Sequence, residues 1–378
     1  MAGYLTVLLV AGGITLLTTP LVRSVAIRMG VVQAPDERRV HTRPTPVLGG
    51  LSMYLGLLGG MAVATRLSQF DPVFHGTSEP IGIVLGATII FVVGLVDDIR
   101  EVSPPAKLAG QVLAASVLSL LGVTMLFFRL PFLGLWSLSP DMAPLVTVLW
   151  VAGMSTAINY IDGLDGLAAG IVAIGAGAFA LYSHHLFDQG LLPNESNSIS
   201  PLVAVIVLGM CIGFLPWNFH PARIFMGDSG ALLLGLLMAS STLLVGGQTA
   251  ESTSGTTFFF FAPLLIPLVI LGVPIFDTAF SIVRRAAKRT SVSVADKDHL
   301  HHRLMRIGHG QRRAVLILWG WTAVLSGLVL VPVYTKSGNA IVPFAVAAMA
   351  ILLFTVLHPE VRRHRADQLE LDLEAETH

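Results

Sequence analysis

The feature that most constrains this chain is a series of long apolar segments separated by short polar loops. We count eleven of them, at roughly 3–22, 47–65, 80–96, 106–122, 142–158, 166–186, 200–217, 229–247, 258–283, 313–333 and 339–357. An apolar run of about 18 residues or more predicts a transmembrane helix. Charged residues make up 12% of the chain, about half the ~25% found in soluble domains. We therefore predict an all-α, polytopic integral membrane protein with about eleven transmembrane helices.

The distribution of Lys and Arg predicts how these helices are oriented. With the N-terminus outside, 20 of the 23 Lys and Arg residues fall on the cytoplasmic side, and the exceptions are Arg66, Arg129 and Lys336. Such an excess of basic residues in the inner loops is the usual signal of orientation. An odd number of helices also places the C-terminus inside. We expect one transmembrane catalytic domain, 1–358, followed by a charged cytoplasmic tail, 359–378.

Simple features of the chain argue against a cleaved signal peptide, a nucleic-acid partner and a structural role for cysteine. The N-terminal stretch "MAGYLTVLLVAGG" has no basic residues before its apolar run, which favours a retained first helix over a cleaved signal peptide. The formal net charge is zero, so nothing in the bulk charge indicates a nucleic-acid partner. The single cysteine, Cys211, can form neither an intrachain disulfide nor a cysteine zinc site.

The polar residues of this chain are concentrated on one side of the membrane. With the N-terminus outside, the clusters "DERRVHTRPTP", "VDDIRE", "NYIDGLDG", "WNFHPARIFMGDSG" and "DKDHLHHRL" all fall on the cytoplasmic side. The outer loops contain scattered acids but no comparable cluster. We therefore expect any chemistry at the cytoplasmic face.

Asp97 and Asp98 lie side by side where the third apolar segment ends. Carboxylates are unfavourable at a helix C-terminus because the helix dipole places partial negative charge there. Adjacent carboxylates also repel each other, so a divalent metal, a cationic neighbour or water must offset the cost. A solvated helix end paired with Arg100 or Lys107 explains the pair about as well as a functional site.

The stretch "NYIDGLDGLAAG" contributes Asn159, Asp162 and Asp165. If this stretch is helical, the two acids are three residues apart and share one face. An Asp near a helix start is also a common cap, which accounts for one of the acids. The three polar groups together favour a functional site between two membrane helices.

The stretch "NFHPARIFMGDSGALLLG" contributes Asn218, Phe225 and Asp228, with Arg223 nearby. Its Gly-Asp-Ser-Gly turn opens the next apolar segment. A glycine-rich turn at a helix N-terminus presents free N–H groups to an anion. Asp228 would repel a bare phosphate but would hold a Mg²⁺ ion that carries one.

A histidine-rich loop, "DKDHLHHRL", contains His299, His301, His302 and Arg303. Histidine binds metals and exchanges protons near neutral pH, and the arginine suits a phosphate. The alternative is an exposed loop with incidental histidines, which three His in four residues make less plausible.

Three further residues are weaker candidates for substrate binding. His41 and Arg43 precede a Pro-rich turn and a Gly-Gly pair, although basic residues there also serve as ordinary inner-face anchors. Asp277 lies within the ninth apolar segment, and an ionisable residue at membrane depth is a functional candidate by default. It could equally be a structural partner of a neighbouring helix.

As a set, these motifs resemble those of the polyprenyl-phosphate N-acetylhexosamine-1-phosphate transferases, from about residue 38 to residue 313. The branch is similar to the WecA/TagO-like N-acetylglucosaminyl enzymes, because "HLHH" matches their His-x-His-His loop. MraY-like enzymes, which take UDP-MurNAc-pentapeptide, usually have three consecutive His. The chain departs from the family pattern at Glu101, where the DDxxD motif has Asp, and at Ala231, where MGDxGS has Ser.

The motifs and the resemblance together give a candidate site. Its catalytic residues would be Asp97, Asp98, Asp162, Asp165, His299, His301 and His302. Its substrate-binding residues would be His41, Arg43, Asn159, Asn218, Phe225, Arg303 and Asp277. Its metal ligands would be Asp228, Asp97 and Asp98.

The resemblance implies transfer of N-acetylglucosamine 1-phosphate from UDP-N-acetylglucosamine to undecaprenyl or another polyprenyl phosphate at the bacterial plasma membrane. It implies Mg²⁺ as cofactor, with Mn²⁺ as a substitute, and it allows a homodimer. Direct attack by the lipid phosphate and a covalent aspartyl intermediate both remain open. The alternatives are an MraY-like phospho-MurNAc-pentapeptide transferase and a membrane transporter. A transporter would place its ionisable groups near the middle of the bilayer rather than at helix ends.

Overall fold

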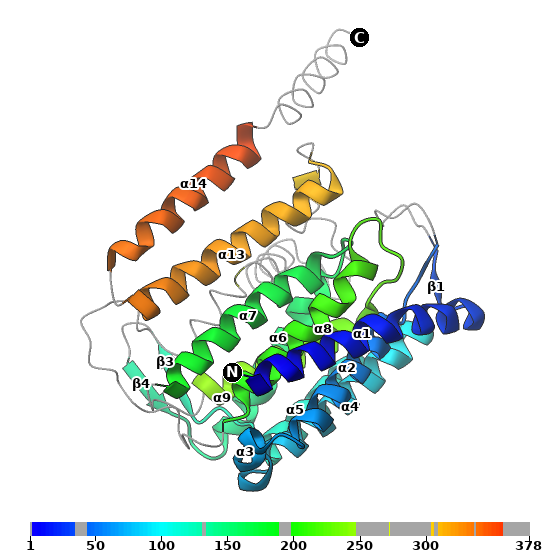
Figure 1. Ribbon diagram of the computed structural model, residues 1–378. Helices are drawn as coiled ribbons and strands as arrows, with labels where there is room; N and C mark the ends of the chain where they lie inside the picture. Colours follow the sequence, from blue (N-terminus) through cyan, green and yellow to red (C-terminus); the bar gives the residue numbers. More distant parts are fainter. Residues whose placement is uncertain are drawn as a thin grey trace.

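The computed structural model describes residues 2–34, 44–130, 134–188, 198–246, 272, 304–305, 309–335 and 338–357. Within these residues the chain is mostly α-helical (Figure 1). The α-helices are α1 (Ala2–Met29), α2 (Gly49–Ala64), α3 (Asp71–Gly76), α4 (Glu79–Ile99), α5 (Pro104–Leu120), α6 (Met142–Ile161), α7 (Leu167–Asp188), α8 (Ser200–Asn218), α9 (Gly227–Gly246), α13 (Gln311–Thr335) and α14 (Val342–Leu357). The 3₁₀ helices are η1 (Ser68–Phe70) and η2 (Gly338–Ile341).

Two short antiparallel ribbons accompany the helices. One pairs β1 (Val32–Gln33) with β2 (Thr45–Pro46), and the other pairs β3 (Phe127–Leu130) with β4 (Gly134–Ser137). The two ribbons lie at opposite ends of the bundle: β3, β4, α3 and the N-terminus are at one end, and β1 with the last turn of α1 is at the other (Figure 1). They mark the two sides of the helical layer.

The helices confirm the all-α membrane class. Ten of the eleven apolar segments coincide with helices, whereas the segment 258–283 lies outside the described residues apart from Gly272. Among the described helices, seven are long and apolar enough to cross a membrane, namely α1, α4, α6, α7, α8, α9 and α13. An eighth crossing would be formed by α2 together with the η1–α3 segment. The chain bends by 94° between α2 and that segment.

Helix α9 is the centre of the bundle. It packs against α4, α6, α2 and α8, and 94% of its most apolar stretch is buried. A helix that is apolar on all sides and surrounded by other helices suits such a place. Outer helices such as α1 instead expose large apolar side chains, including Leu9 at 62% and Leu17 at 71%, as a lipid-facing surface does. The first residues of α9 therefore hold a fixed place relative to four neighbouring helices.

The C-terminal helices form a separate edge of the bundle. Helix α13 packs between α7 and α14, and α13 and α14 run side by side along one edge (Figure 1). Trp319 of α13 reaches α7, where its indole N–H donates to the Leu167 carbonyl at 3.4 Å. This contact joins α13 to the first residue of α7.

Candidate active site

The turn that opens α9 is held from outside by the segment before α2. The Phe225 N–H donates to the Pro46 carbonyl at 2.9 Å, and the Phe225 carbonyl accepts the Gly49 N–H at 2.9 Å. The Met226 carbonyl accepts the Gly50 N–H at 2.8 Å. Two distant parts of the chain are thus joined strand-like, which fixes the backbone immediately before Asp228.

Asp98 caps the first turn of α9. Its Oδ1 accepts the Asp228 N–H at 2.7 Å, and its Oδ2 accepts the Ser229 N–H at 3.1 Å and the Ser229 hydroxyl at 2.5 Å. The first N–H groups of a helix have no partner within the helix, and the positive end of the dipole lies there. The carboxylate that is unfavourable at the end of α4 is therefore stabilised by the start of α9.

Two glycines allow α4 and α9 to approach this closely. Gly227 has φ of 70°, and a Cβ added to it would lie 2.5 Å from Oδ2 of Asp98. A Cβ on Gly94, one turn before Asp98, would lie 2.5 Å from the Cα of Ser229. The contact between the Asp98 carboxylate and the α9 start requires both positions to lack a side chain.

Gly227→Ala is expected to lower the free energy of unfolding by about 1–2 kcal/mol, the usual cost of a left-handed residue with a Cβ. The added methyl would also meet the Asp98 carboxylate, which adds to the loss of stability. Thermal unfolding in detergent checks the first effect. Gly153→Ala is the matched control, because nothing lies within 4 Å of its added Cβ. If both variants unfold at the same temperature, the argument about Gly227 is wrong.

Asp97 and Asp228 converge on one cation, the Lys107 ammonium. Nζ of Lys107 lies 2.8 Å from Oδ2 of Asp97 and also contacts Oδ2 of Asp228. The other oxygen of Asp97 accepts the Val102 N–H at 2.8 Å. Lys107, which the sequence indicated only as a possible partner of Asp97 and Asp98, is therefore part of the site.

A signal for Lys107 was present in the sequence. It lies in the first turn of α5, two residues after Pro105. A basic residue is unfavourable at a helix N-terminus for the same reason that a carboxylate is unfavourable at a C-terminus. An acid pair at the end of one helix and a lysine at the start of the next are both unfavourable alone. Together they indicate that the end of α4 and the start of α5 form an ion pair.

Asn159 and Asp162 approach the same acidic cluster from the end of α6. The Asn159 amide donates to Oδ1 of Asp228 at 3.0 Å. Burial raises the pKa of the Asp162 carboxyl well above its usual range, and it is raised further by three neighbouring carboxylates, those of Asp228, Asp98 and Asp165. A cation added beside these carboxylates would stabilise the charged form of Asp162.

The sequence places Asp162 and Asp165 on one helix face only if the stretch is helical, and the structure shows that it is not. Helix α6 ends at Ile161, and the following residues form a turn in which Gly166 has φ of 76°. The turn sends the two acids to different partners. Asp165 is 7% exposed and its Oδ2 accepts the Ala222 N–H at 3.0 Å and lies 2.7 Å from Nδ1 of His220.

Asn218 links the same two loops. Its Oδ1 accepts the Gly166 N–H at 3.1 Å, and its Nδ2 donates to the Ile224 carbonyl at 3.1 Å. Asn218 is 2% exposed. The side chains of Asn218 and Asp165 are buried and hydrogen-bonded to protein groups, so they position the two loops. His220, which contacts Asp165, was not among the predicted site residues.

Comparison with known proteins places this arrangement in a family. The family model described as glycosyl transferase family 4 matches residues 80–246, which contain every acid of the cluster. The chain is 36% identical to a decaprenyl-phosphate N-acetylglucosaminephosphotransferase of Mycolicibacterium smegmatis, over 94% of this chain and 88% of that protein. This chain belongs to glycosyl transferase family 4.

Other members of glycosyl transferase family 4 are also similar. A probable undecaprenyl-phosphate N-acetylglucosaminyl 1-phosphate transferase of Bacillus subtilis is 36% identical, over 83% of this chain and 81% of that protein. A phospho-N-acetylmuramoyl-pentapeptide-transferase of a Mycobacterium species is 30% identical, over 85% of this chain and 95% of that protein. The two branches weighed from the sequence are thus both represented among its relatives.

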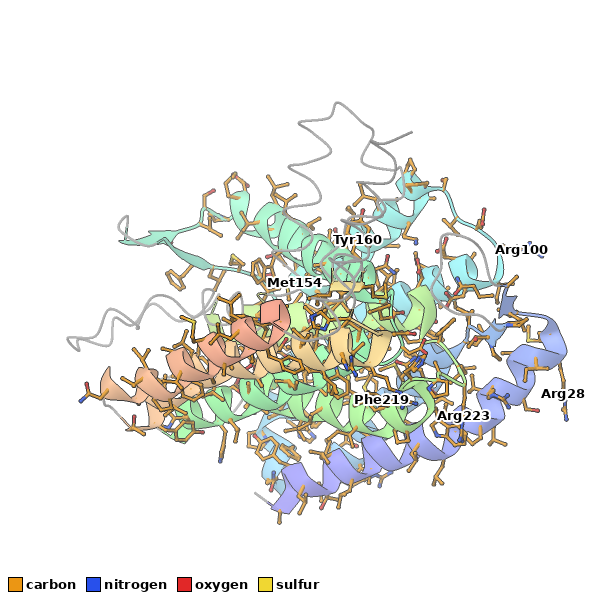
Figure 2. All side chains as sticks on the ribbon, turned by 90° about the horizontal axis from the view of Figure 1, so that it is seen from above. Arg28, Arg100, Met154, Tyr160, Phe219 and Arg223 are labelled. Carbon is orange, nitrogen blue, oxygen red and sulfur yellow. The ribbon has the colours of Figure 1, made fainter. Side chains whose placement is uncertain are left out.

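The structure brings six of the predicted site residues to one end of the bundle. They come from the ends of α4, α6 and α8, from the turn after α6 and from the start of α9, and they are Asp97, Asp98, Asn159, Asp162, Asn218 and Asp228. Arg28, Arg100 and Arg223 lie toward this same end (Figure 2). Seven predicted residues lie outside the described residues: His41, Arg43, Asp277, His299, His301, His302 and Arg303. Phe225 contributes its backbone, as described above, and Asp165 joins the loop beside the cluster.

The donor set is suited to Mg²⁺ completed by a substrate. Within the described ranges, no three His, Cys, Asp or Glu side chains are grouped closely enough to hold a metal by themselves. Two carboxylate oxygens, from Asp97 and Asp228, do converge on one point, where Lys107 lies. Mg²⁺ is usually bound by one or two carboxylates plus water and substrate phosphates, so two convergent oxygens fit it.

Proposed function

We propose that this member of glycosyl transferase family 4 transfers N-acetylglucosamine 1-phosphate from UDP-N-acetylglucosamine to a polyprenyl phosphate, releasing UMP. The observation that carries the proposal is the joining of Asp97, Asp98 and Asp228 at the start of α9, beside Lys107. The names of the relatives that match most of the chain support the same reaction.

The reaction brings together two anions, a lipid phosphate and a nucleotide diphosphate, and the site offers charges that reduce their repulsion. The N-terminus of α9 and the Lys107 ammonium are both positive. Mg²⁺ or Mn²⁺ held by Asp228 and Asp97 would neutralise charge on the phosphoryl oxygens during transfer. These partly buried acids in turn provide the negative charge that retains such an ion.

The hydrogen bonding favours direct attack over a covalent aspartyl intermediate. Both oxygens of Asp98 already accept donors from Asp228 and Ser229. The lipid phosphate is itself ionised near neutral pH and needs no strong base. In the proposed step an oxygen of the lipid phosphate bonds to the phosphorus that carries the sugar. The bond from that phosphorus to the UMP oxygen breaks, and UMP leaves with its electron pair.

We place this site at the cytoplasmic face of the bacterial plasma membrane, in a chain of eleven spans with its N-terminus outside and its tail, 359–378, inside. The excess of Lys and Arg in the loops on that side supports this orientation. So does the location of the acidic cluster at the end of the bundle that also carries Arg28, Arg100 and Arg223. A soluble nucleotide sugar would then reach the site directly from the cytoplasm.

The test is UMP release by the full-length protein in detergent with UDP-N-acetylglucosamine and undecaprenyl phosphate. We expect release to require both substrates and to fall to background when EDTA removes divalent metal. Mn²⁺ should restore part of the activity. These dependences check the donor, the acceptor and the metal separately.

Two other outcomes would change the assignment. Release with UDP-MurNAc-pentapeptide but not with UDP-N-acetylglucosamine would move the chain to the branch of the Mycobacterium relative. No release with any UDP-sugar would contradict the proposed reaction and return the transporter to consideration.

A further inference from the structure

Among the described residues, Lys107 lies at the point where two acids of the site converge. Its ammonium bridges Oδ2 of Asp97 and Oδ2 of Asp228. The remaining oxygens of these two acids already accept hydrogen bonds, from the Val102 N–H and the Asn159 amide. The two oxygens that face Lys107 point at the same position, so this is where one cation can replace another.

An ammonium and a metal ion cannot share this position. Mg²⁺ binds oxygen at about 2.0–2.1 Å and demands near-octahedral geometry. The Asp97 oxygen is 2.8 Å from Nζ, so an ion bound between the two carboxylates would occupy the space of the ammonium. Two positive charges at that separation would also repel strongly in a partly buried site.

The two carboxylates are the groups that hold the Lys107 ammonium in place. It lies in the first turn of α5, where the positive end of the helix dipole opposes its charge. Its side chain is a flexible four-carbon stem that is 23% exposed. The ammonium can therefore leave without disturbing the backbone of α5.

We propose that Lys107 is a displaceable counter-ion: it holds Asp97 and Asp228 together, and a divalent cation replaces it and frees its ammonium for the substrate phosphates. This inference rests on the proposed function for the identity of those phosphates, but the competition itself needs no substrate. In this exchange, binding of the metal also releases the Lys107 ammonium, which can then contact the substrate phosphates.

The first test measures binding of Mn²⁺ alone to the full-length protein in detergent, from the electron paramagnetic resonance signal of the free ion. Lys107→Met removes the competing charge and should lower the Kd for Mn²⁺ by at least about tenfold, because a unit charge so close to the ion costs more than that even with strong screening. Lys107→Arg is the control and should keep the wild-type Kd within about threefold, since it keeps the competing charge. A Kd for Lys107→Met equal to or weaker than that of the wild type would overturn the proposal.

The second test uses the wild type and so does not depend on how the variants fold. The Lys107 amine should react several times faster with an acylating reagent when Mg²⁺ is saturating, because it is released from its two carboxylates. Mass spectrometry of the digested protein reads this, with the peptides of the other three lysines as internal standards. Equal labelling with and without Mg²⁺ would overturn the exchange.

The two proposals fail separately. Tighter Mn²⁺ binding by Lys107→Met without UMP release by the wild type would keep the exchange and contradict the transferase. UMP release with unchanged Mn²⁺ binding and unchanged labelling would do the reverse.

Discussion

Asp98→Asn is expected to reduce UMP release by about 10²-fold, the usual effect of displacing a reacting group by roughly 1 Å. Asp98 accepts three hydrogen bonds from Asp228 and Ser229 at the start of α9. An amide can accept the bond from the Asp228 N–H, but its NH₂ group would then face the Ser229 N–H. The first turn of α9 would shift, and Asp228 would move with it.

The same substitution should lower the free energy of unfolding by about 1.5–3 kcal/mol, because a hydrogen bond to a charged acceptor is lost. Ser229→Ala is the matched control. It removes only the hydroxyl donor at 2.5 Å and leaves both N–H bonds in place. We expect it to retain UMP release within about fivefold, the equivalent of about 1 kcal/mol in the barrier, because both N–H bonds that hold the first turn of α9 remain. Asp98→Asn with wild-type turnover would show that the cap does not position Asp228.

The helices could be predicted from the sequence because each apolar run is sufficient by itself to specify one. Segments such as 80–96 and 229–247 became α4 (Glu79–Ile99) and α9 (Gly227–Gly246), with ends only a few residues away. The bend of 94° after α2 could not be predicted. It depends on how η1 and α3 pack against the bundle, and Phe70 is 2% exposed there. Apolar content alone contains no information about that contact.

The sequence predicted which acids belong to the site, but not which groups they contact. The helix-dipole argument correctly identified Asp97 and Asp98 as acids that need an electrostatic partner. It could not show that Asp98 would cap α9, 130 residues later, because that requires the packing of α4 on α9. Lys107 was counted as an inner-face basic residue, and its place in a helix's first turn was not used.

The turn after α6 was misjudged for a local reason. Asp162 and Asp165 are three residues apart, a spacing that puts them on one face only if the stretch is helical. Gly163 and Gly166 interrupt that stretch, and glycines at such spacing favour a turn. Helix α6 ends at Ile161, so both acids lie in the turn and not on a helix face. Asp165 consequently contacts His220, a partner that no spacing rule could supply.

Asp228→Asn is expected to have the largest effect, a loss of UMP release on the order of 10³-fold, as when a preorganised electrostatic group is removed. Asp228 accepts the Asn159 amide on one oxygen and the Lys107 ammonium on the other. An amide at this position cannot satisfy both donors, and it removes the negative charge that would retain a divalent cation. Mn²⁺ binding should be lost together with turnover, and the two measurements on one preparation check this.

Asp165→Asn provides the control, because it is the same chemical change in a neighbouring loop. Both contacts use one oxygen, Oδ2, so an amide oxygen in that place can still accept the Ala222 N–H and, in the tautomer that carries a proton on Nδ1, the His220 N–H. We therefore expect it to retain Mn²⁺ binding and to lose less than about tenfold in UMP release, the equivalent of about 1.4 kcal/mol. Equal losses in the two variants would show that the effect is not specific to Asp228. A selective loss in Asp228→Asn would show that the carboxylate facing Lys107 binds the cation, because Asp165 faces His220 instead.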